Sequence, residues 1–204
     1  RLFTGLGAAS VVAGGQSMNP STAELLDAVE RCPSPEVVLL PNNSNIVAVA
    51  RQVDGLTSTK VVRVVPTSAV NGGLAALVAF DPRRDAEENA KAMAEAAEGI
   101  IAGEVTRAVR PSSSGVGPIA EGDWIGIGPS GIEAVAPDVV GATTGLLEAV
   151  VGEGHELVTL IEGEQAQGDD TAAITGWLAE HRPGVEVEVH QGGQPLYPYL
   201  LGIE

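Results

Sequence analysis

The first half of the chain alternates short apolar runs with longer amphipathic segments. Apolar runs without alternation are typical of strands that helices cover on both faces. The pattern predicts strands at Ser10–Ala13, Val37–Leu40 and Val61–Val65, and helices over residues 21–31, 46–53 and 70–80. Because each helix joins one strand to the next, right-handed crossovers predict a parallel, doubly wound α/β sheet.

Polar residues mark where these helices begin. Ser21 and Glu24 have the spacing of a capping box, and Asn43 precedes the next helix as an N-cap. Asp81-Pro82 ends the helix that starts at residue 70, and an alanine- and glutamate-rich helix is predicted over residues 85–99. We therefore expect a parallel α/β lobe over residues 1–84 and a connector helix over 85–103.

The second half has a different pattern and predicts a mixed α/β lobe over residues 104–204. Antiparallel strands are expected on either side of a Ser/Gly-rich turn at 112–117. Asp169-Asp170 are expected to cap a helix that reaches His181. The elements expected here are strands at 104–109, 124–127, 157–161, 185–189 and near Leu200, and helices at 139–151 and 169–181.

Charge and composition exclude two classes of partner. The 204 residues carry a formal net charge of −16, with 11 scattered basic residues. Binding to nucleic acid or to an anionic membrane needs clustered Lys and Arg, so neither is expected. The acidity either keeps the protein soluble or provides a surface for a basic partner.

The compartment is predicted to be the cytoplasm. No apolar stretch reaches the length of a membrane span, and no signal peptide opens the chain. The single cysteine, Cys32, has no partner for a disulfide within the chain. The first residue is Arg1, not Met, so we expect the chain to be cut from a longer protein.

Motifs for catalysis or metal binding are weak or absent. There is no phosphate-binding loop of the Gly-x-x-x-x-Gly-Lys-Ser/Thr type, and Gly126–Gly131 matches a dinucleotide motif only in spacing, so we interpret it as a hairpin turn. The histidines His155, His181 and His190 lack a second ligand at metal spacing. Asp169-Asp170 could hold magnesium, but a helix cap explains the pair better. We therefore predict no catalytic residues, metal or cofactor in this chain.

The strand-to-helix turns of the first half are the best candidate for a binding site. They place small polar residues at the carboxyl edge of the predicted sheet, where helix N-termini favour a carboxylate or phosphate. The same residue types are also good helix caps, which is the alternative explanation. The candidates in these turns are Gln16, Ser17, Asn43, Thr67 and Ser68.

Four segments, in this order, resemble a known family. They are Gly14-Gly-Gln-Ser-Met-Asn-Pro-Ser21, Leu40-Pro-Asn-Asn-Ser-Asn-Ile46, Gly73-Leu-Ala-Ala-Leu-Val-Ala-Phe-Asp-Pro82 and Gly193-Gln-Pro-Leu-Tyr-Pro-Tyr199. Together they resemble the C-terminal domain of bacterial fatty-acid kinases, a family also described as dihydroxyacetone-kinase-like. The resemblance spans almost the whole chain.

The resemblance implies a DegV-like fold and a kinase as the parent protein. In the family, ATP and magnesium belong to an N-terminal domain that this chain lacks. Its partners are DegV-like fatty-acid-binding proteins, whose bound fatty acid is phosphorylated on its carboxylate for phospholipid synthesis. Those partners hold the carboxylate with Ser or Thr at the sheet edge and a C-terminal His. Thr67 or Ser68 and His190 resemble that arrangement, but Gln194-Pro195-Leu196 replaces a glycine-rich signature after the His.

Three functions therefore remain open at this point. The first is a domain that docks a DegV-like partner and the other domains of a kinase. The second is a lipid- or small-anion-binding domain that uses the carboxyl-edge turns. The third is an autonomous phosphatase or kinase, for which the sequence offers no converging acids. A two-fold homodimer is the default expectation for oligomeric state.

Overall fold

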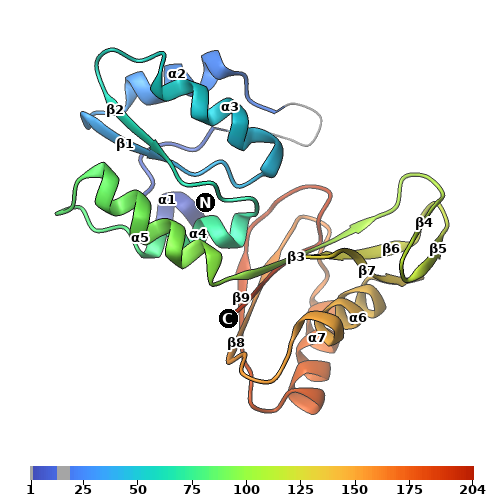
Figure 1. Cartoon of the computed structure of the whole chain (residues 1–204). Coiled ribbons are helices and arrows are strands. Elements are labelled where there is room, and N and C mark those ends of the chain that lie inside the picture. Colours follow the sequence, from blue (N-terminus) through green and yellow to red (C-terminus); the bar gives the residue numbers. More distant parts are fainter. Residues whose placement is uncertain (1, 13–18) are drawn as a thin grey trace. The chain divides into compact units, whose positions relative to one another are not determined.

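The computed structural model describes residues 2–12 and 19–204. They form two compact units, Arg1–Ile100 and Ile101–Glu204 (Figure 1). The predicted connector over 85–103 does not follow this division. Its helix, α5 (Ala86–Glu98), packs on α4 (Val70–Val78) in the first unit, and residues 101–103 open the first strand of the second.

The first unit is built on two parallel strands, β1 (Glu36–Leu39) and β2 (Val61–Val64), joined through α3 (Ser44–Asp54). Their side chains alternate between two apolar clusters, one on each face of the sheet. Val37 and Leu39 pack with α3 and with α2 (Thr22–Arg31), whereas Val38 packs with α4 and α5. Figure 1 shows the two helix pairs on opposite sides of the strands. Coverage of both faces explains the apolar runs that lack alternation.

The two helix caps predicted in the first unit are confirmed. Ser21 and Glu24 form the capping box of α2, and Asn43 accepts a hydrogen bond from the Asn45 N–H at the start of α3. Asp85 caps α5 in the same way, through the N–H of Glu88. These side chains satisfy backbone donors that the first turn of a helix leaves unpaired.

The predicted first strand is wrong for its described part. Residues 10–12 form no strand, and Ala13 lies outside the described residues. Val12 packs against the α2–α3 cluster, whereas Val11 is 56% exposed. A run with so few buried side chains gains little from pairing in the sheet. The chain instead begins with a short helix, α1 (Leu2–Gly5), that contacts α4.

The second unit contains a mixed six-stranded sheet in the order β7-β6-β3-β10-β8-β9. All neighbours are antiparallel except β8 and β9, which are parallel and joined through α7 (Gly168–His181). The strands are β3 (Ile101–Arg107), β6 (Trp124–Gly128), β7 (Gly131–Ala136), β8 (Leu157–Glu162), β9 (Glu186–Gln191) and β10 (Tyr199–Ile203).

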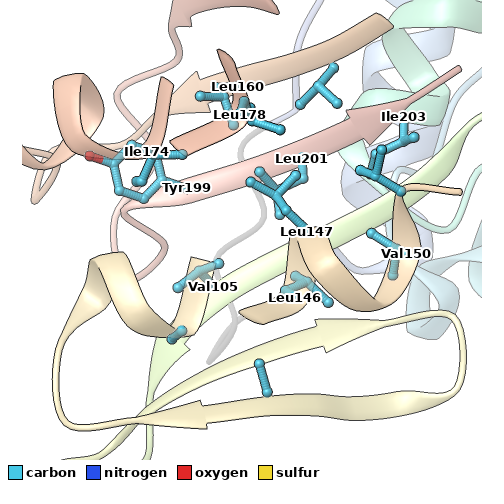
Figure 2. Packing of buried hydrophobic residues seen from close by; sticks show 14 residues of the cluster. Val105, Leu146, Leu147, Val150, Leu160, Ile174, Leu178, Tyr199, Leu201 and Ile203 are labelled. Carbon is cyan, nitrogen blue, oxygen red and sulfur yellow. The ribbon is translucent and has the colours of Figure 1, made fainter. Parts of the chain in front are cut away.

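The core of this unit lies between the sheet and the helices α6 (Val139–Val150) and α7 (Figure 2). Leucines 146 and 147 of α6 face Leu201 of β10 in this core. Gly126 lets α6 approach β6, because a Cβ there would lie 2.7 Å from the Leu146 Cβ. The last strand, β10, is the most buried, with all five residues buried between β3 and β8.

Two turns were predicted in the second unit, and the structure confirms one of them as predicted. The segment predicted as a Ser/Gly-rich turn is a small hairpin of β4 (Ser112–Ser114) and β5 (Gly117–Ile119). The Gly126–Gly131 segment is a hairpin turn, as predicted, because Gly128 pairs with Gly131 across β6 and β7. Along the described residues, no helix combines the length and apolar character needed to span a bilayer.

Candidate functional site at the carboxyl edge of the first sheet

The two strands of the first unit end side by side in similar sequences. Leu39 pairs with Val64 at the ends of the two strands, and Asn42 and Thr67 each lie three residues further along the chain. Each of these residues follows a proline, Pro41 or Pro66. Because parallel strands end at the same edge of a sheet, the polar turns after β1 and β2 meet there.

Thr67, which is buried, and Asn42, which is half-buried, form a hydrogen-bonded pair at this edge. The Thr67 hydroxyl donates to Asn42 Oδ1 at 2.8 Å and accepts from the Asn42 backbone N–H at 3.0 Å. Thr67 is only 2% exposed, and Asn42 has a left-handed backbone with φ of 55°. A hydroxyl has a single hydrogen to donate, so the hydrogen of Thr67 is already used within the chain.

Gly73 of α4 is required by this pair. A Cβ at Gly73 would lie 1.9 Å from Asn42 Oδ1, far closer than van der Waals contact. The Asn42 carboxamide therefore occupies the space beside the first turns of α4. The sequence shows Gly-Gly in an apolar helix, but only the fold shows why residue 73 has no side chain.

The other predicted edge residues have separate positions. The side chain of Asn43 is used as the N-cap of α3. Ser68 is exposed and lies two residues before α4. Gln16 and Ser17 lie outside the described residues.

Asn71, which sequence reasoning missed, is the most unusual polar residue at the edge. It lies in the first turn of α4 and is 6% exposed, yet neither Nδ2 nor Oδ1 has a hydrogen-bond partner among residues 2–12 and 19–204. The N-cap of α4 is Ala69, which offers no capping side chain. Buried polar groups are nearly always paired, so this amide is an exception that calls for a ligand or a role. An isolated Asn in an apolar helix was the available signal.

His190 lies in the second unit, on the edge strand β9. Its Nε2 is 3.1 Å from Glu188 Oε2, and the side chains of the two residues are 45% and 51% exposed. The ring is therefore a surface group on its own strand. Thr67 belongs to the first unit and His190 to the second.

A second buried polar cluster lies where β8 and β9 end and α7 begins. The Thr171 hydroxyl and the Gln191 amide both donate to the Glu162 carboxylate, and the hydroxyls of Tyr199 and Thr171 are 2.9 Å apart. Burial, as the main cause, raises the pKa of Tyr199. Every member has a partner, so the cluster ties three strands to α7.

The two aspartates at the start of α7 do not cap it as predicted. The N-cap is Gln167, without a side-chain hydrogen bond, and Asp169 and Asp170 lie inside the first turn. Their charges there still favour the helix through its dipole. Within residues 2–12 and 19–204, no three or more His, Cys, Asp or Glu side chains group as a metal site would.

Comparisons with known proteins agree over the full chain. Residues 1–204 match the family of C-terminal domains of fatty acid kinase A-like proteins. An uncharacterized protein of Staphylococcus haemolyticus and Protein YloV of Bacillus subtilis are each 37% identical over 203 residues. The match covers 100% of this chain but 37% and 36% of those proteins, so the chain spans little more than a third of their length.

Solved structures share the fold at low sequence identity. The Streptococcus pneumoniae fatty acid kinase B3 protein, loaded with linoleic acid, has a TM-score of 0.62 at 12% identity, covering 91% of this chain and 76% of that one. The dihydroxyacetone kinase of C. freundii has a TM-score of 0.58 at 15% identity, covering 90% and 41%. A DegV family protein of Corynebacterium glutamicum has a TM-score of 0.59 at 15% identity, covering 95% and 86%. The mixed α/β fold is thus DegV-like, and the chain belongs to the fatty acid kinase A-like C-terminal family.

Proposed function

We propose that this chain is the C-terminal domain of a fatty-acid kinase and that its task is to dock a DegV-like fatty-acid-binding partner. The observation that carries the proposal is the family match over all 204 residues. The relatives are almost three times as long, which leaves room for other domains in the parent protein. In this proposal those domains hold ATP and magnesium and phosphorylate the acyl carboxylate for phospholipid synthesis.

The hydrogen bonds at the carboxyl edge of the first sheet favour the docking function over ligand binding at Thr67. The hydroxyl hydrogen of Thr67 is directed to Asn42, and the side-chain oxygen of Asn43 caps α3. A ligand carboxylate at Thr67 would have to displace the Asn42 carboxamide from its part-buried hydrogen bond with the Thr67 hydroxyl. Breaking such a pair leaves a buried polar group unsatisfied, which opposes binding.

Calorimetry tests the docking proposal directly. The 204-residue chain is titrated with the DegV-like protein of the same organism, once loaded with a long-chain fatty acid and once stripped of lipid. Saturable binding is expected in at least one of the two titrations. No heat of binding with either form at high micromolar concentration contradicts the proposal.

Asn71 favours a second candidate function, the binding of a small carboxylate or other anion. In the part of the chain that the structure describes, no group pairs with its buried amide, and the first turn of α4 has no side-chain cap. Helix N-termini and amide donors both favour anionic oxygens. In this alternative, a carboxylate such as oleate raises the melting temperature of the chain, and Asn71→Ala removes the effect while Ser68→Ala keeps it. Lipid extraction that recovers no acyl chain, together with no thermal shift, contradicts it.

A further inference from the structure

The segment that joins β9 to β10 contains a strained leucine. Leu196 has φ of 69°, a left-handed conformation that is rare for residues other than glycine. The Tyr197 N–H donates to the Pro195 carbonyl at 2.9 Å across it, closing a three-residue turn. Turns of this kind with positive φ are rare and strained, and strain of this sort is concentrated at functional sites.

Several hydrogen bonds hold the turn in this conformation. The Thr106 hydroxyl of β3 donates to the Leu196 carbonyl at 2.8 Å. The side-chain amide of Gln194 donates to the carbonyl of Ile161 at 3.0 Å. On the other side, the N–H of Gly163 donates to the Pro198 carbonyl at 2.8 Å. The surrounding structure therefore imposes the backbone of Leu196 and keeps it rigid.

Close packing beneath the turn adds to this restraint. A Cβ at Gly163 would lie 2.1 Å from the Tyr197 carbonyl oxygen, so the two backbones meet directly. Pro195 and Pro198 restrict the chain on both sides of the leucine. A loop that is already ordered loses little conformational entropy when it binds a partner.

The leucine side chain contributes little to the core of its own unit. Leu196 is 50% exposed, and it belongs to none of the apolar clusters that the described residues form. The folded chain thus holds Leu196 in a strained backbone conformation although its apolar side chain is half exposed to solvent. Neither burial nor turn chemistry explains a leucine here, since glycine adopts this conformation without strain.

The charge of the surrounding unit indicates what kind of surface meets Leu196. Residues 101–204, all of them described, contain 16 acidic and three basic residues, a net charge of −13, against −3 for residues 1–100. No Arg or Lys forms an ion pair with an acid in this unit. Glu164 is exposed and lies beside the turn, because its backbone N–H donates to the Gln194 carbonyl. The complementary surface is therefore basic.

We propose that Leu196 is the apolar anchor of the docking surface, and that it inserts into an apolar pocket of the partner protein edged by Lys and Arg. The proposal rests on the docking function proposed above and places it on the second unit. Protein interfaces commonly have an apolar core surrounded by a polar rim, and a few central residues carry most of the binding energy. Binding should also weaken as salt is added, because exposed charges are screened.

Two substitutions at one position test the anchor. Leu196→Ala removes most of the side chain, and Leu196→Gly removes all of it and also relieves the backbone strain. Each is titrated by calorimetry against the DegV-like protein loaded with a long-chain fatty acid. We expect both to bind at least about tenfold more weakly than the wild-type chain. Leu196→Gly is expected to have a higher melting temperature than Leu196→Ala, because glycine adopts the backbone conformation without strain. Weak binding in both variants, despite this difference in stability, then shows that the loss of binding does not come from a loss of folding.

Val116 provides the matched control. It is 52% exposed on the β4–β5 hairpin of the same unit, and Val116→Ala is expected to bind like the wild-type chain. Wild-type affinity in Leu196→Ala overturns the anchor but leaves docking standing. No binding by the wild-type chain itself overturns both proposals.

Discussion

At the scale of single residues, neighbours of one type have unrelated roles. Gly72 and Gly73 are adjacent in α4, and their missing side chains face different surroundings. A Cβ at Gly72 would lie 3.6 Å from the Ala97 carbonyl oxygen, an ordinary contact, whereas one at Gly73 would overlap the Asn42 carboxamide. The sequence marks both as glycine in a helix, where glycine is unfavourable. Only the contact with Asn42 separates them.

This pair gives a prediction with an internal control. Gly73→Ala forces the Asn42 side chain away from Thr67, so it is expected to lower the free energy of unfolding by about 2 to 3 kcal/mol. Gly72→Ala meets no clash and is expected to raise it by about 0.5 to 1 kcal/mol, through helix propensity. Urea denaturation of the two variants measures both values. Equal stability of the two variants contradicts the role assigned to Asn42.

At the scale of elements, the segment between β9 and β10 is anchored on β3. Thr106 holds the carbonyl of Leu196, and Tyr197 lies close enough to Glu104 to feel its charge. Burial, and then this charge, raises the pKa of Tyr197 to about 12, and burial raises the pKa of Glu104. Burial is the first cause of both shifts, so Glu104 on β3 and Tyr197 of the segment are each partly shielded from solvent.

The raised pKa of Tyr197 predicts that the folded protein loses stability at alkaline pH. In the unfolded chain Tyr197 loses its proton near the ordinary pKa of 10, whereas the folded protein keeps it to about 12. Its contribution to stability is complete below pH 10 and is lost as the pH rises to about 12. Tyr197→Phe is expected to reduce the loss of stability between about pH 9 and about pH 11.5 in urea denaturation. Some loss of stability with rising pH is expected to remain in Tyr197→Phe, because the pKa of Tyr199 is also raised. An unchanged pH profile in Tyr197→Phe contradicts the shift.

Among the helices and strands, local sequence signals such as capping residues were better predictors than apolar runs, which form strands only where a partner strand is available. The capping box at Ser21 and the cap at Asn43 were predicted and confirmed, because capping involves residues within one turn. The strand at Ser10–Ala13 failed for residues 10–12, since an apolar run becomes a strand only where a partner strand accepts it. The hairpin at 112–119 was predicted only as a turn, because its serines carry no apolar alternation.

At the scale of the whole molecule, the two units differ sharply in charge. The net charge of −16 is concentrated in residues 101–204, which carry −13. Ion pairs between arginine and acids occur among the described residues of the first unit, but none occurs in the second. Unpaired like charges repel one another and destabilise a compact fold.

Salt is therefore expected to stabilise the protein. Raising NaCl from about 50 mM to about 500 mM shortens the screening length and should raise the melting temperature. Glu153 and Glu186 are exposed, and replacing both with glutamine is expected to give part of the same increase at low salt. Differential scanning calorimetry measures both effects. A melting temperature that falls with added NaCl contradicts this account.

The sequence by itself determined the helices, most strands, the acidic charge and the family resemblance. These depend on local periodicity, capping and the order of short motifs, which neighbouring residues define. Only the tertiary structure placed β10 in the middle of the second sheet, paired Thr67 with Asn42, left Asn71 without a partner among the described residues and held Leu196 in its strained turn. These features depend on contacts between residues far apart in the chain, whose geometry no local pattern records.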